Sequence, residues 1–309
     1  MDFTGADILS IKQFNRGDIE TVLKTAARAE PFAHKERWSD ALDKKMMAAL
    51  FYEPSTRTRL SFENSMQRLG GRVISAVGME NSSLKKGETL YDTGRMVENY
   101  ADVIVMRHPD EGSVAKLAEG ANVPVINAGD GSGEHPSQAL LDLYTMQKER
   151  GKIDGLKIAM VGDLKFGRTV HSLALALSHF DVELVFVSPE ELKMPELVKT
   201  TLREAQISFE ETVAMEPVLS RVDVLYMTRV QQERFNDLAE YEKYRGQYVL
   251  TNELVRHHNP ELTILHPLPR IWELEPDVDQ LPGAAYFRQV HNAVAVRMAL
   301  LSLVLGKHL

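Results

Sequence analysis

A hydroxyl-rich run with a central arginine, Ser55-Thr-Arg-Thr-Arg59, contains the residue types that bind an anion. It lies between an apolar stretch at 46–51, which predicts a buried strand, and an amphipathic stretch ended by two glycines, which predicts a helix. Free N–H groups and the positive end of the helix dipole suit a phosphate at such a helix start. The planar guanidinium of Arg57 matches phosphate geometry. The alternative is an ordinary helix capped by Ser55, with its arginines in solvent.

Further cations follow other predicted strands. Arg107 comes directly after the apolar stretch 101–106, and Arg229 follows the stretch 223–227. Arg168 stands at the start of a predicted helix, after another strand. Because open α/β sheets bind ligands beyond the carboxyl ends of their strands, these positions favour contact with an anionic ligand. The alternative is that each is a surface arginine.

His135 precedes a proline at the predicted start of a helix, in the run His135-Pro-Ser-Gln138. Proline suits the first helical turn, so the imidazole would lie beside the positive end of the dipole. That position disfavours the imidazolium, and a neutral imidazole can polarise a carbonyl group. The stretch 127–134 before it is too rich in glycine to predict a regular element. An ordinary loop histidine is the alternative.

Residues 81–88 form a polar stretch that predicts a loop, and they include Ser82, Ser83 and Lys86. Taken alone, this stretch favours a solvated charge pair before the next helix.

Composition limits the class of protein. The 309 residues suggest two domains, 44% of them are hydrophobic, and the formal net charge of −8 argues against a nucleic-acid surface. The absence of cysteine excludes disulfides, thiol catalysis and cysteine-ligated zinc. We expect a cytoplasmic protein without membrane contact, because the start lacks the apolar core of a signal peptide and no apolar run could span a bilayer.

A second α/β unit begins near residue 155, with a strand at 156–161, a tight turn and a helix at 169–177. This pattern invites a dinucleotide-binding interpretation. However, the turn lacks the G-x-G-x-x-G spacing, and the next strand ends in Ser188 and Pro189 rather than at a ribose-binding acid. The sequence therefore disfavours a dinucleotide site.

From about residue 8 to the end, the chain resembles the aspartate and ornithine transcarbamoylases. Seven separated motifs occur in the family's order: Ser55-Thr-Arg-Thr-Arg59, Lys86-Gly-Glu-Thr89, Arg107-His-Pro109, His135-Pro-Ser-Gln138, Asp163-Leu-Lys-Phe-Gly-Arg-Thr169, Thr228-Arg-Val-Gln231 and His266-Pro-Leu-Pro-Arg270. The ornithine branch typically carries a His-Cys-Leu-Pro motif where this chain has Pro267. The aspartate branch is therefore the better match.

The resemblance implies an α/β fold of two doubly wound parallel-sheet domains with linking helices. Residues 1–135, joined by a last helix at 292–309, would bind carbamoyl phosphate, and residues 150–291 would bind aspartate. It also implies a homotrimer with shared active sites, no metal, no organic cofactor, and a cis peptide bond at Leu268–Pro269. The activity implied is transfer of the carbamoyl group to the amine of L-aspartate, a step of pyrimidine biosynthesis.

The resemblance also implies a role for each residue that matches a family motif. Phosphate would be bound by Ser55, Thr56, Arg57 and Thr58. Arg107 would span the phosphate and the carbonyl oxygen, whose developing charge Thr58, Arg107 and His135 would stabilise. The polar loop would contribute Ser83, or its neighbour Ser82, together with Lys86. The catalytic set implied is therefore Arg57, Thr58, Lys86, Arg107 and His135.

The remaining roles concern the carbamoyl amide and the two carboxylates of aspartate. The carbamoyl amide would be held by Gln138 and by the backbone carbonyls of Pro267 and Leu268. Arg168 would take the α-carboxylate of aspartate. Its β-carboxylate would be taken by Arg229 and Gln231, with help from Lys86. No protein nucleophile is needed, because the amine attacks directly and the departing phosphate can accept its proton.

Charge balance agrees with an acidic acceptor, since a phosphoryl group and two carboxylates would meet five cationic side chains. Two alternatives stay open: a carbamoyltransferase for another acceptor, such as ornithine or an acylated derivative, and a non-catalytic protein that only binds anions. The sequence also leaves open whether separate regulatory chains bind and whether the kinetics are cooperative.

Overall fold

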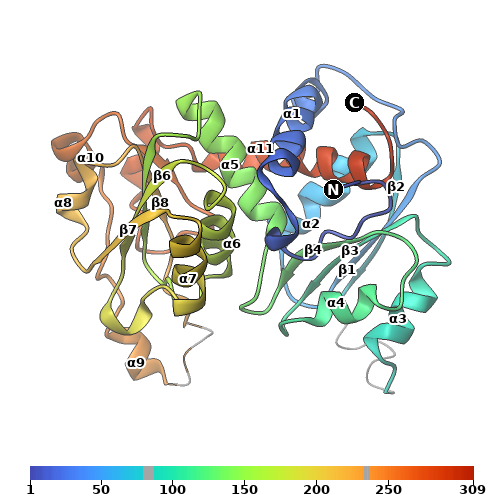
Figure 1. The fold of residues 1–309 in the computed structure, drawn as a ribbon, viewed down its shortest axis with the longest axis horizontal. Helices are drawn as coiled ribbons and strands as arrows, with labels where there is room; N and C mark the ends of the chain where they lie inside the picture. Colours follow the sequence, from blue (N-terminus) through green and yellow to red (C-terminus); the bar gives the residue numbers. More distant parts are fainter. Residues whose placement is uncertain (79–86, 233–234, 236) are drawn as a thin grey trace. The chain divides into compact units, whose positions relative to one another are not determined.

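The structure is a computed structural model that describes residues 1–78, 87–232, 235 and 237–309. The chain forms two compact units: unit 1 comprises residues 1–144 with 290–309, and unit 2 comprises residues 145–289. It passes from unit 1 to unit 2 within helix α5 (Pro136–Arg150) and returns within helix α11 (Tyr286–Val304) (Figure 1).

Unit 1 contains a four-stranded sheet in the order β2-β1-β3-β4, in which every pair is parallel. Its inner strands are nearly continuous apolar runs, as expected for parallel strands covered on both faces. Three short helices connect the strands. The elements are β1 (Met46–Phe51), α2 (Thr56–Arg68), β2 (Arg72–Val77), α3 (Leu90–Val97), β3 (Val103–His108), α4 (Ser113–Ala118) and β4 (Val125–Asp130).

The sheet of unit 1 is covered on both faces (Figure 1). Helices α3 and α4 lie on one face, and α2, α1 (Arg16–Ala33) and the end of α11 lie on the other. The Ser65 hydroxyl of α2 donates to the backbone carbonyl of Val294 at 3.0 Å, which fixes α11 against α2. The last helix therefore packs on unit 1.

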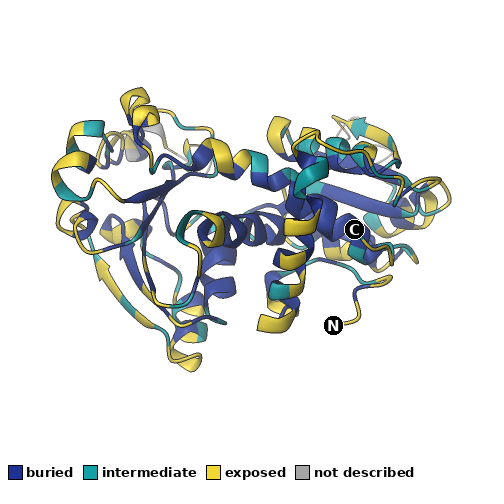
Figure 2. Cartoon of the chain, turned by 90° about the horizontal axis from the view of Figure 1, so that it is seen from above, coloured by how far each residue is buried: buried dark blue, intermediate teal, exposed yellow. Residues whose placement is uncertain are grey.

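Unit 2 contains a five-stranded parallel sheet in the order β7-β6-β5-β8-β9. Figure 2 shows the central strands of both units buried between partly exposed helices. The elements are β5 (Leu156–Val161), α6 (Arg168–Leu177), β6 (Val182–Val187), α7 (Glu196–Glu204), β7 (Ser208–Thr212), α8 (Glu216–Leu219), β8 (Val224–Met227), α9 (Leu238–Glu242), α10 (Asn252–His258) and β9 (Thr263–Leu265). The expected fold class, two parallel-sheet α/β domains, is confirmed.

Two expectations about element bounds are wrong. The glycine-rich stretch was expected to be irregular, but β4 continues to Asp130. Its pairing with β3 shifts register between Met106 and His108, and the Asn127 side chain donates to the Leu9 carbonyl and accepts from the Gly129 amide. The last helix begins at Tyr286 rather than near residue 292.

Strand β2 was not predicted from the sequence, and its burial in the structure does not follow a strict alternation. It is the edge strand of its sheet, and Ile74 and Val77 remain about half exposed. Within the part of the chain that the structure describes, no helix is both long enough and apolar enough to cross a membrane.

Helices α3 and α4 approach so closely that their contact requires glycine. A Cβ atom added at Gly94 would lie 2.3 Å from the Leu117 carbonyl oxygen, and one at Gly120 would lie 2.1 Å from that of Tyr91. We expect Gly94→Ala to lower the free energy of unfolding by about 1–3 kcal/mol, because the backbones must separate. Urea denaturation measures the change.

The matched control is Gly17→Ala in the first turn of α1, where the added Cβ meets only a side-chain oxygen at 3.3 Å. Alanine has the higher helix propensity, so this variant should be unchanged or slightly more stable. Equal destabilisation of the two variants would contradict the close-packing argument.

Candidate active site

The hydroxyl-rich run opens helix α2 at the carboxyl end of β1. Ser55 occupies the N-cap position, but among the described residues its side chain makes no capping hydrogen bond. Thr56 and Arg57 are exposed, whereas Thr58 is buried. The ordinary explanation for Ser55, a hydroxyl that caps its own helix, is therefore not what the structure shows. The start of α2 presents hydroxyls, a guanidinium and first-turn N–H groups, as an anion site requires.

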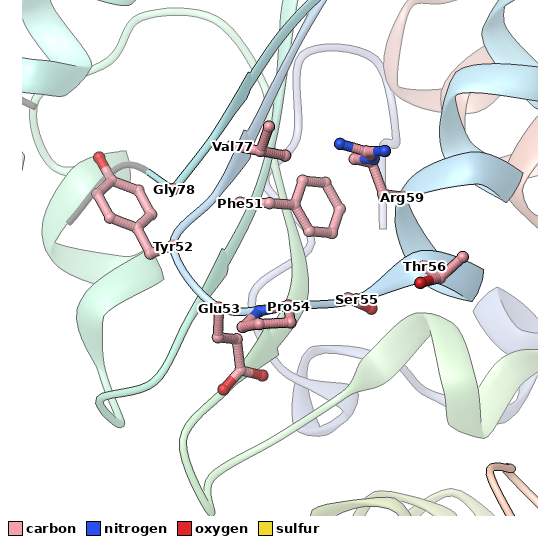
Figure 3. A pocket seen from close by; sticks show the side chains of 9 residues that line it. All are labelled: Phe51, Tyr52, Glu53, Pro54, Ser55, Thr56, Arg59, Val77 and Gly78. Carbon is pink, nitrogen blue, oxygen red and sulfur yellow. The ribbon is translucent and has the colours of Figure 1, made fainter. Parts of the chain in front are cut away.

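A pocket of about 280 Å³ lies against this turn. Residues 51–56, Arg59, Val77 and Gly78 line it, and Figure 3 shows that Glu53 and Arg59 point away from each other. Its lining comes from the ends of β1 and β2 and the start of α2. All of these residues belong to unit 1.

Arg107 lies near the carboxyl end of β3, beside this turn, because the parallel register pairs it with Phe51 of β1. The Tyr52 amide donates to the Arg107 carbonyl at 2.9 Å. Two residues after Phe51, the Glu53 carboxylate forms an ion pair with the Arg107 guanidinium at 2.6 Å. Arg107 also donates to the Ala128 carbonyl of β4 at 3.4 Å. The guanidinium is thus held at the carboxyl edge of the sheet with a carboxylate in contact.

His135 lies at the start of α5 and is almost fully buried, with 3% of its surface exposed. Its carbonyl accepts hydrogen bonds from the amides of Gln138 (2.9 Å) and Ala139 (3.2 Å), so it occupies the position that the sequence predicted. The Ser137 hydroxyl lies 3.4 Å from its Nδ1. The imidazole is therefore held at the positive end of α5 in a site of low dielectric constant.

Gln138 is oriented by a residue to which the sequence analysis gave no role. Its Nε2 donates to Oδ1 of Asp142 at 2.8 Å, and Asp142 has no exposed surface. This bond fixes which end of the Gln138 amide is the carbonyl oxygen, since Nε2 is engaged. The two residues are four apart on one helix, and that spacing is the only sequence signal that could have found the pair.

In unit 2, a second buried acid joins two loops that carry candidate residues. Asp163 follows β5 and accepts hydrogen bonds from the amides of Lys165 (3.2 Å), Phe166 (2.9 Å) and Gln231 (3.4 Å). The Gln231 side chain returns a bond to the Phe166 carbonyl at 3.1 Å. Burial raises the pKa of the Asp163 carboxyl, while those amides and Arg229 act in the opposite direction.

Asp163 therefore connects the loop that precedes Arg168 with the loop that carries Arg229 and Gln231. The backbones of the two loops also lie close together at Gly162. A Cβ atom added there would lie 2.1 Å from the Thr228 carbonyl oxygen. An aromatic cluster packs beside them. Its members are Leu192, Val230, Tyr241 and Tyr244, with Phe166, Phe235 and Trp272 partly buried against them.

The turn after β9 carries the two expected backbone carbonyls. The peptide bond Leu268–Pro269 is cis, as expected, and Leu268 has a φ of 55°. Pro267 and Leu268 are both partly exposed. Three sequence-predicted residues, Ser82, Ser83 and Lys86, lie outside the residues that the structure describes.

Each unit thus brings its own candidates to the carboxyl edge of a parallel sheet. In unit 1 these are Ser55, Thr56, Arg57, Thr58, Arg107, His135 and Gln138. In unit 2 these are Arg168, Arg229, Gln231, Pro267 and Leu268. This edge is where open α/β sheets bind ligands.

Known proteins match this chain along its length. Residues 6–148 match the aspartate/ornithine carbamoyltransferase carbamoyl-P binding domain, and residues 154–304 match the Asp/Orn binding domain of the same family. The aspartate carbamoyltransferase catalytic subunit of Thermococcus kodakarensis is 53% identical over 306 residues, which cover 99% of each chain.

Solved structures agree. The catalytic subunit of M. jannaschii aspartate transcarbamoylase matches with a TM-score of 0.89 and 49% identity, covering 96% of each chain. The aspartate transcarbamoylase of Trypanosoma cruzi, solved in complex with carbamoyl phosphate and aspartate, matches with a TM-score of 0.92 and 38% identity, covering 98% of each chain. These matches confirm the class of activity that the motifs implied, and the chain belongs to the aspartate/ornithine carbamoyltransferase family.

Proposed function

We propose that this chain transfers the carbamoyl group of carbamoyl phosphate to the amine of L-aspartate, giving N-carbamoyl-L-aspartate and phosphate, a step of pyrimidine biosynthesis. The observation that carries the proposal is the position of the guanidinium of Arg107 beside the start of α2, in the domain matched to carbamoyl phosphate binding. Relatives named aspartate carbamoyltransferases, more than half identical to this chain, support aspartate as the acceptor.

In unit 1, the phosphate is held at the start of α2. The hydroxyls of Ser55, Thr56 and Thr58 donate to its oxygens, and Arg57 supplies a charge-assisted fork. Arg107 contacts both the phosphate and the carbonyl oxygen. Its fixed position between β1 and β4 supports this role, because a guanidinium that is already held loses little freedom when the ligand binds.

The chemical step creates negative charge on the carbonyl oxygen when the amine attacks. Thr58, Arg107 and His135 stabilise that charge. Burial of Thr58 and His135 supports the assignment, because donors fixed in a water-poor site need no reorganisation as the charge develops. The departing phosphate accepts the proton of the amine, so the side chains contribute orientation and electrostatics rather than a nucleophile.

The carbamoyl amide has two N–H groups to be held. Asp142 engages Nε2 of Gln138, which leaves the Gln138 carbonyl oxygen as the acceptor for one of them. The backbone carbonyls of Pro267 and Leu268 accept the other. These groups distinguish a carbamoyl group from an acyl group that has no N–H donors.

In unit 2, Arg168 binds the α-carboxylate of aspartate, and Arg229 with Gln231 binds the β-carboxylate. Asp163 supports this assignment, since it fixes the backbone of both loops at once. Ornithine would bring an ammonium group to the position of Arg229, and like charges repel. The competing function, carbamoyl transfer to ornithine or to an acylated derivative, is therefore the weaker candidate.

We further propose a homotrimer in which the loop with Ser83 and Lys86 completes the site of the neighbouring subunit. The exposed apolar side chains of unit 1 support an interface near that loop. Six of the nine large apolar side chains that are exposed in the described part of unit 1 lie between residues 60 and 100 of the sequence, and two of these six, Ile74 and Val77, belong to the edge strand β2. The others are Leu60, Tyr91, Met96 and Tyr100.

The activity and the role of His135 can be tested together. The purified chain should carbamoylate L-aspartate and leave L-ornithine unchanged. We expect His135→Ala to lower kcat by roughly 10²–10³-fold, because one donor to the developing oxyanion is lost. Carbamoyl phosphate affinity should change much less, and calorimetry measures it separately from turnover.

The control variant is His308→Ala, which removes an exposed histidine near the end of the chain. Its kcat should equal that of the unmodified enzyme. Faster transfer to ornithine than to aspartate would overturn the proposed acceptor, and an unchanged kcat in His135→Ala would remove His135 from the mechanism.

The Glu53–Arg107 ion pair predicts a competition. An incoming phosphate must share the Arg107 guanidinium with the Glu53 carboxylate, which lies 2.6 Å away. Glu53→Gln removes the competing charge, so we expect inorganic phosphate to bind more tightly, by roughly fivefold or about 1 kcal/mol. Isothermal titration calorimetry measures the dissociation constant.

Glu20→Gln is the matched control, since Glu20 pairs with Arg16 on the exposed face of α1 in the same unit. It loses the same formal charge and should leave phosphate affinity unchanged. Weaker phosphate binding in Glu53→Gln than in this control would show that Glu53 organises the site rather than competes for it.

Hybrid trimers test the shared site. Lys86→Ala chains and His135→Ala chains, each inactive alone, are dissociated, mixed and reassembled. If the loop acts on the neighbouring subunit, some sites combine an intact Lys86 with an intact His135, and activity returns. Each variant reassembled alone is the control. Hybrids confirmed by native mass measurement but without activity would rule out the shared site.

A further inference from the structure

A buried histidine in unit 2 is bonded through both ring nitrogens. His266 follows β9 and has 1% of its surface exposed. Its Nδ1 lies 2.7 Å from the Leu268 amide nitrogen, and its Nε2 lies 2.8 Å from Oε1 of Glu273. Glu273 is equally buried, with 1% exposed. Neither His266 nor Glu273 has a role in the substrate contacts proposed above.

The two partners define the tautomer of the imidazole. A backbone N–H can only donate, so Nδ1 must accept the bond from Leu268 and carries no proton. The proton therefore resides on Nε2, which donates it to the Glu273 carboxylate. Burial alone would raise the pKa of Glu273, but the hydrogen bonds from His266 and from backbone amides lower that pKa below its usual value. Glu273 thus stays ionised and favours this tautomer.

The carboxylate end of this pair is firmly anchored. Glu273 accepts further bonds from the amides of Ile271 (3.3 Å) and Trp272 (3.2 Å). Its backbone carbonyl accepts a bond from the Leu250 amide at 2.9 Å, where Leu250 and Leu274 form a parallel bridge. The His266 amide is also held, by Oε1 of Gln289 at 2.9 Å. The imidazole therefore has little freedom to rotate.

The other end of the pair holds a backbone conformation that leucine rarely adopts. Leu268 has a φ of 55°, in the left-handed region, where its Cβ crowds the backbone. Such a conformation persists only when its surroundings impose it. The bond from the Leu268 amide to Nδ1 of His266 acts directly on this peptide unit.

We propose that Glu273 and His266 form a positioning relay, in which the carboxylate fixes the tautomer of the imidazole and the imidazole fixes the Leu268 peptide, so that the carbonyls of Pro267 and Leu268 are aimed at the carbamoyl amide. The inference rests on the proposed function, because the carbonyls matter only if they bind that group. Glu273 and His266 are positioning residues and do not touch the substrate.

A purely structural ion pair between His266 and Glu273 would require a different property of the side chain at position 266 than the relay does. Such a pair needs a donor to Glu273, whereas the relay also needs an acceptor for the Leu268 amide. Two substitutions separate the demands. His266→Asn places an amide group near the former Nδ1 and can still accept from Leu268, while His266→Gln reaches toward the former Nε2 and can still donate to Glu273.

The relay predicts that the two variants rank oppositely in stability and in activity. His266→Asn should melt at the lower temperature, because Glu273 loses its donor. It should nevertheless keep kcat/KM for carbamoyl phosphate within about tenfold of the unmodified enzyme. His266→Gln should melt at a higher temperature than His266→Asn. Its kcat/KM for carbamoyl phosphate should nevertheless fall roughly 10²-fold, because the carbonyls are misplaced. Activity that follows melting temperature across the pair would overturn the proposal.

Glu273 is tested by substitution and by spectroscopy. Glu273→Gln keeps an acceptor for Nε2–H and should retain more activity than Glu273→Leu, which keeps none. The nitrogen-15 spectrum of the His266 ring should show a protonated Nε2 and a bare Nδ1 in the unmodified enzyme. In Glu273→Leu it should show a mixture of tautomers. A ring protonated on Nδ1 in the unmodified enzyme would overturn the relay.

Two measurements separate failure of the relay from failure of the proposed function. The tautomer and the melting temperatures need no substrate, so they test the relay even if the unmodified chain transfers no carbamoyl group. Inorganic phosphate binding, assigned to unit 1, should be unchanged in all four variants, and a loss there would indicate general misfolding. Glu275→Gln, an exposed acid two residues away, is the matched control and should keep full activity.

Discussion

The register of β1 on β3 determines where the charges of unit 1 lie. Because Phe51 pairs with Arg107, the chain that leaves β1 passes directly over the Arg107 guanidinium, and Glu53 contacts it. A slip of one residue would send Arg107 to the other face of the sheet. The apolar strand residues therefore decide the position of the cation as much as Arg107 itself does, since the register depends on which side chains are buried.

The sequence predicted the position of strands whose apolar runs are nearly continuous, such as β5 and β6. Parallel strands that are buried on both faces are mostly apolar, so such runs identify them. It failed at β4, where the Asn127 side chain makes bonds to the Leu9 carbonyl and the Gly129 amide that no periodicity reveals. The cations were found because arginines after strands are conspicuous. Asp142 was missed, because a buried acid and a solvated acid look alike until the tertiary contacts are known.

Three acids that received no role from the sequence share one physical task. Asp142 orients the amide of Gln138, Asp163 fixes the loop that carries Gln231, and Glu273 fixes the imidazole of His266. All three are fully or almost fully buried. A carboxylate suits this task because it accepts several bonds and donates none, so the orientation of each partner has no alternative. Asp142 thus determines which atom Gln138 presents, whereas Asp163 and Glu273 hold the turns beside them in place.

This arrangement explains how a chain of net charge −8 can present sites for anions. Asp142, Asp163 and Glu273 are buried, while Arg57 and Arg168 stand at helix starts whose dipoles add to the positive potential. Burying a carboxylate destabilises the fold unless donors compensate it, and for Asp163 and Glu273 backbone amides are among those donors. The same amides belong to the turns that carry the ligand-facing groups. The hydrogen bonds that compensate a buried carboxylate therefore also restrict the turns that carry the candidate site residues. One set of contacts thus contributes both to stability and to preorganisation.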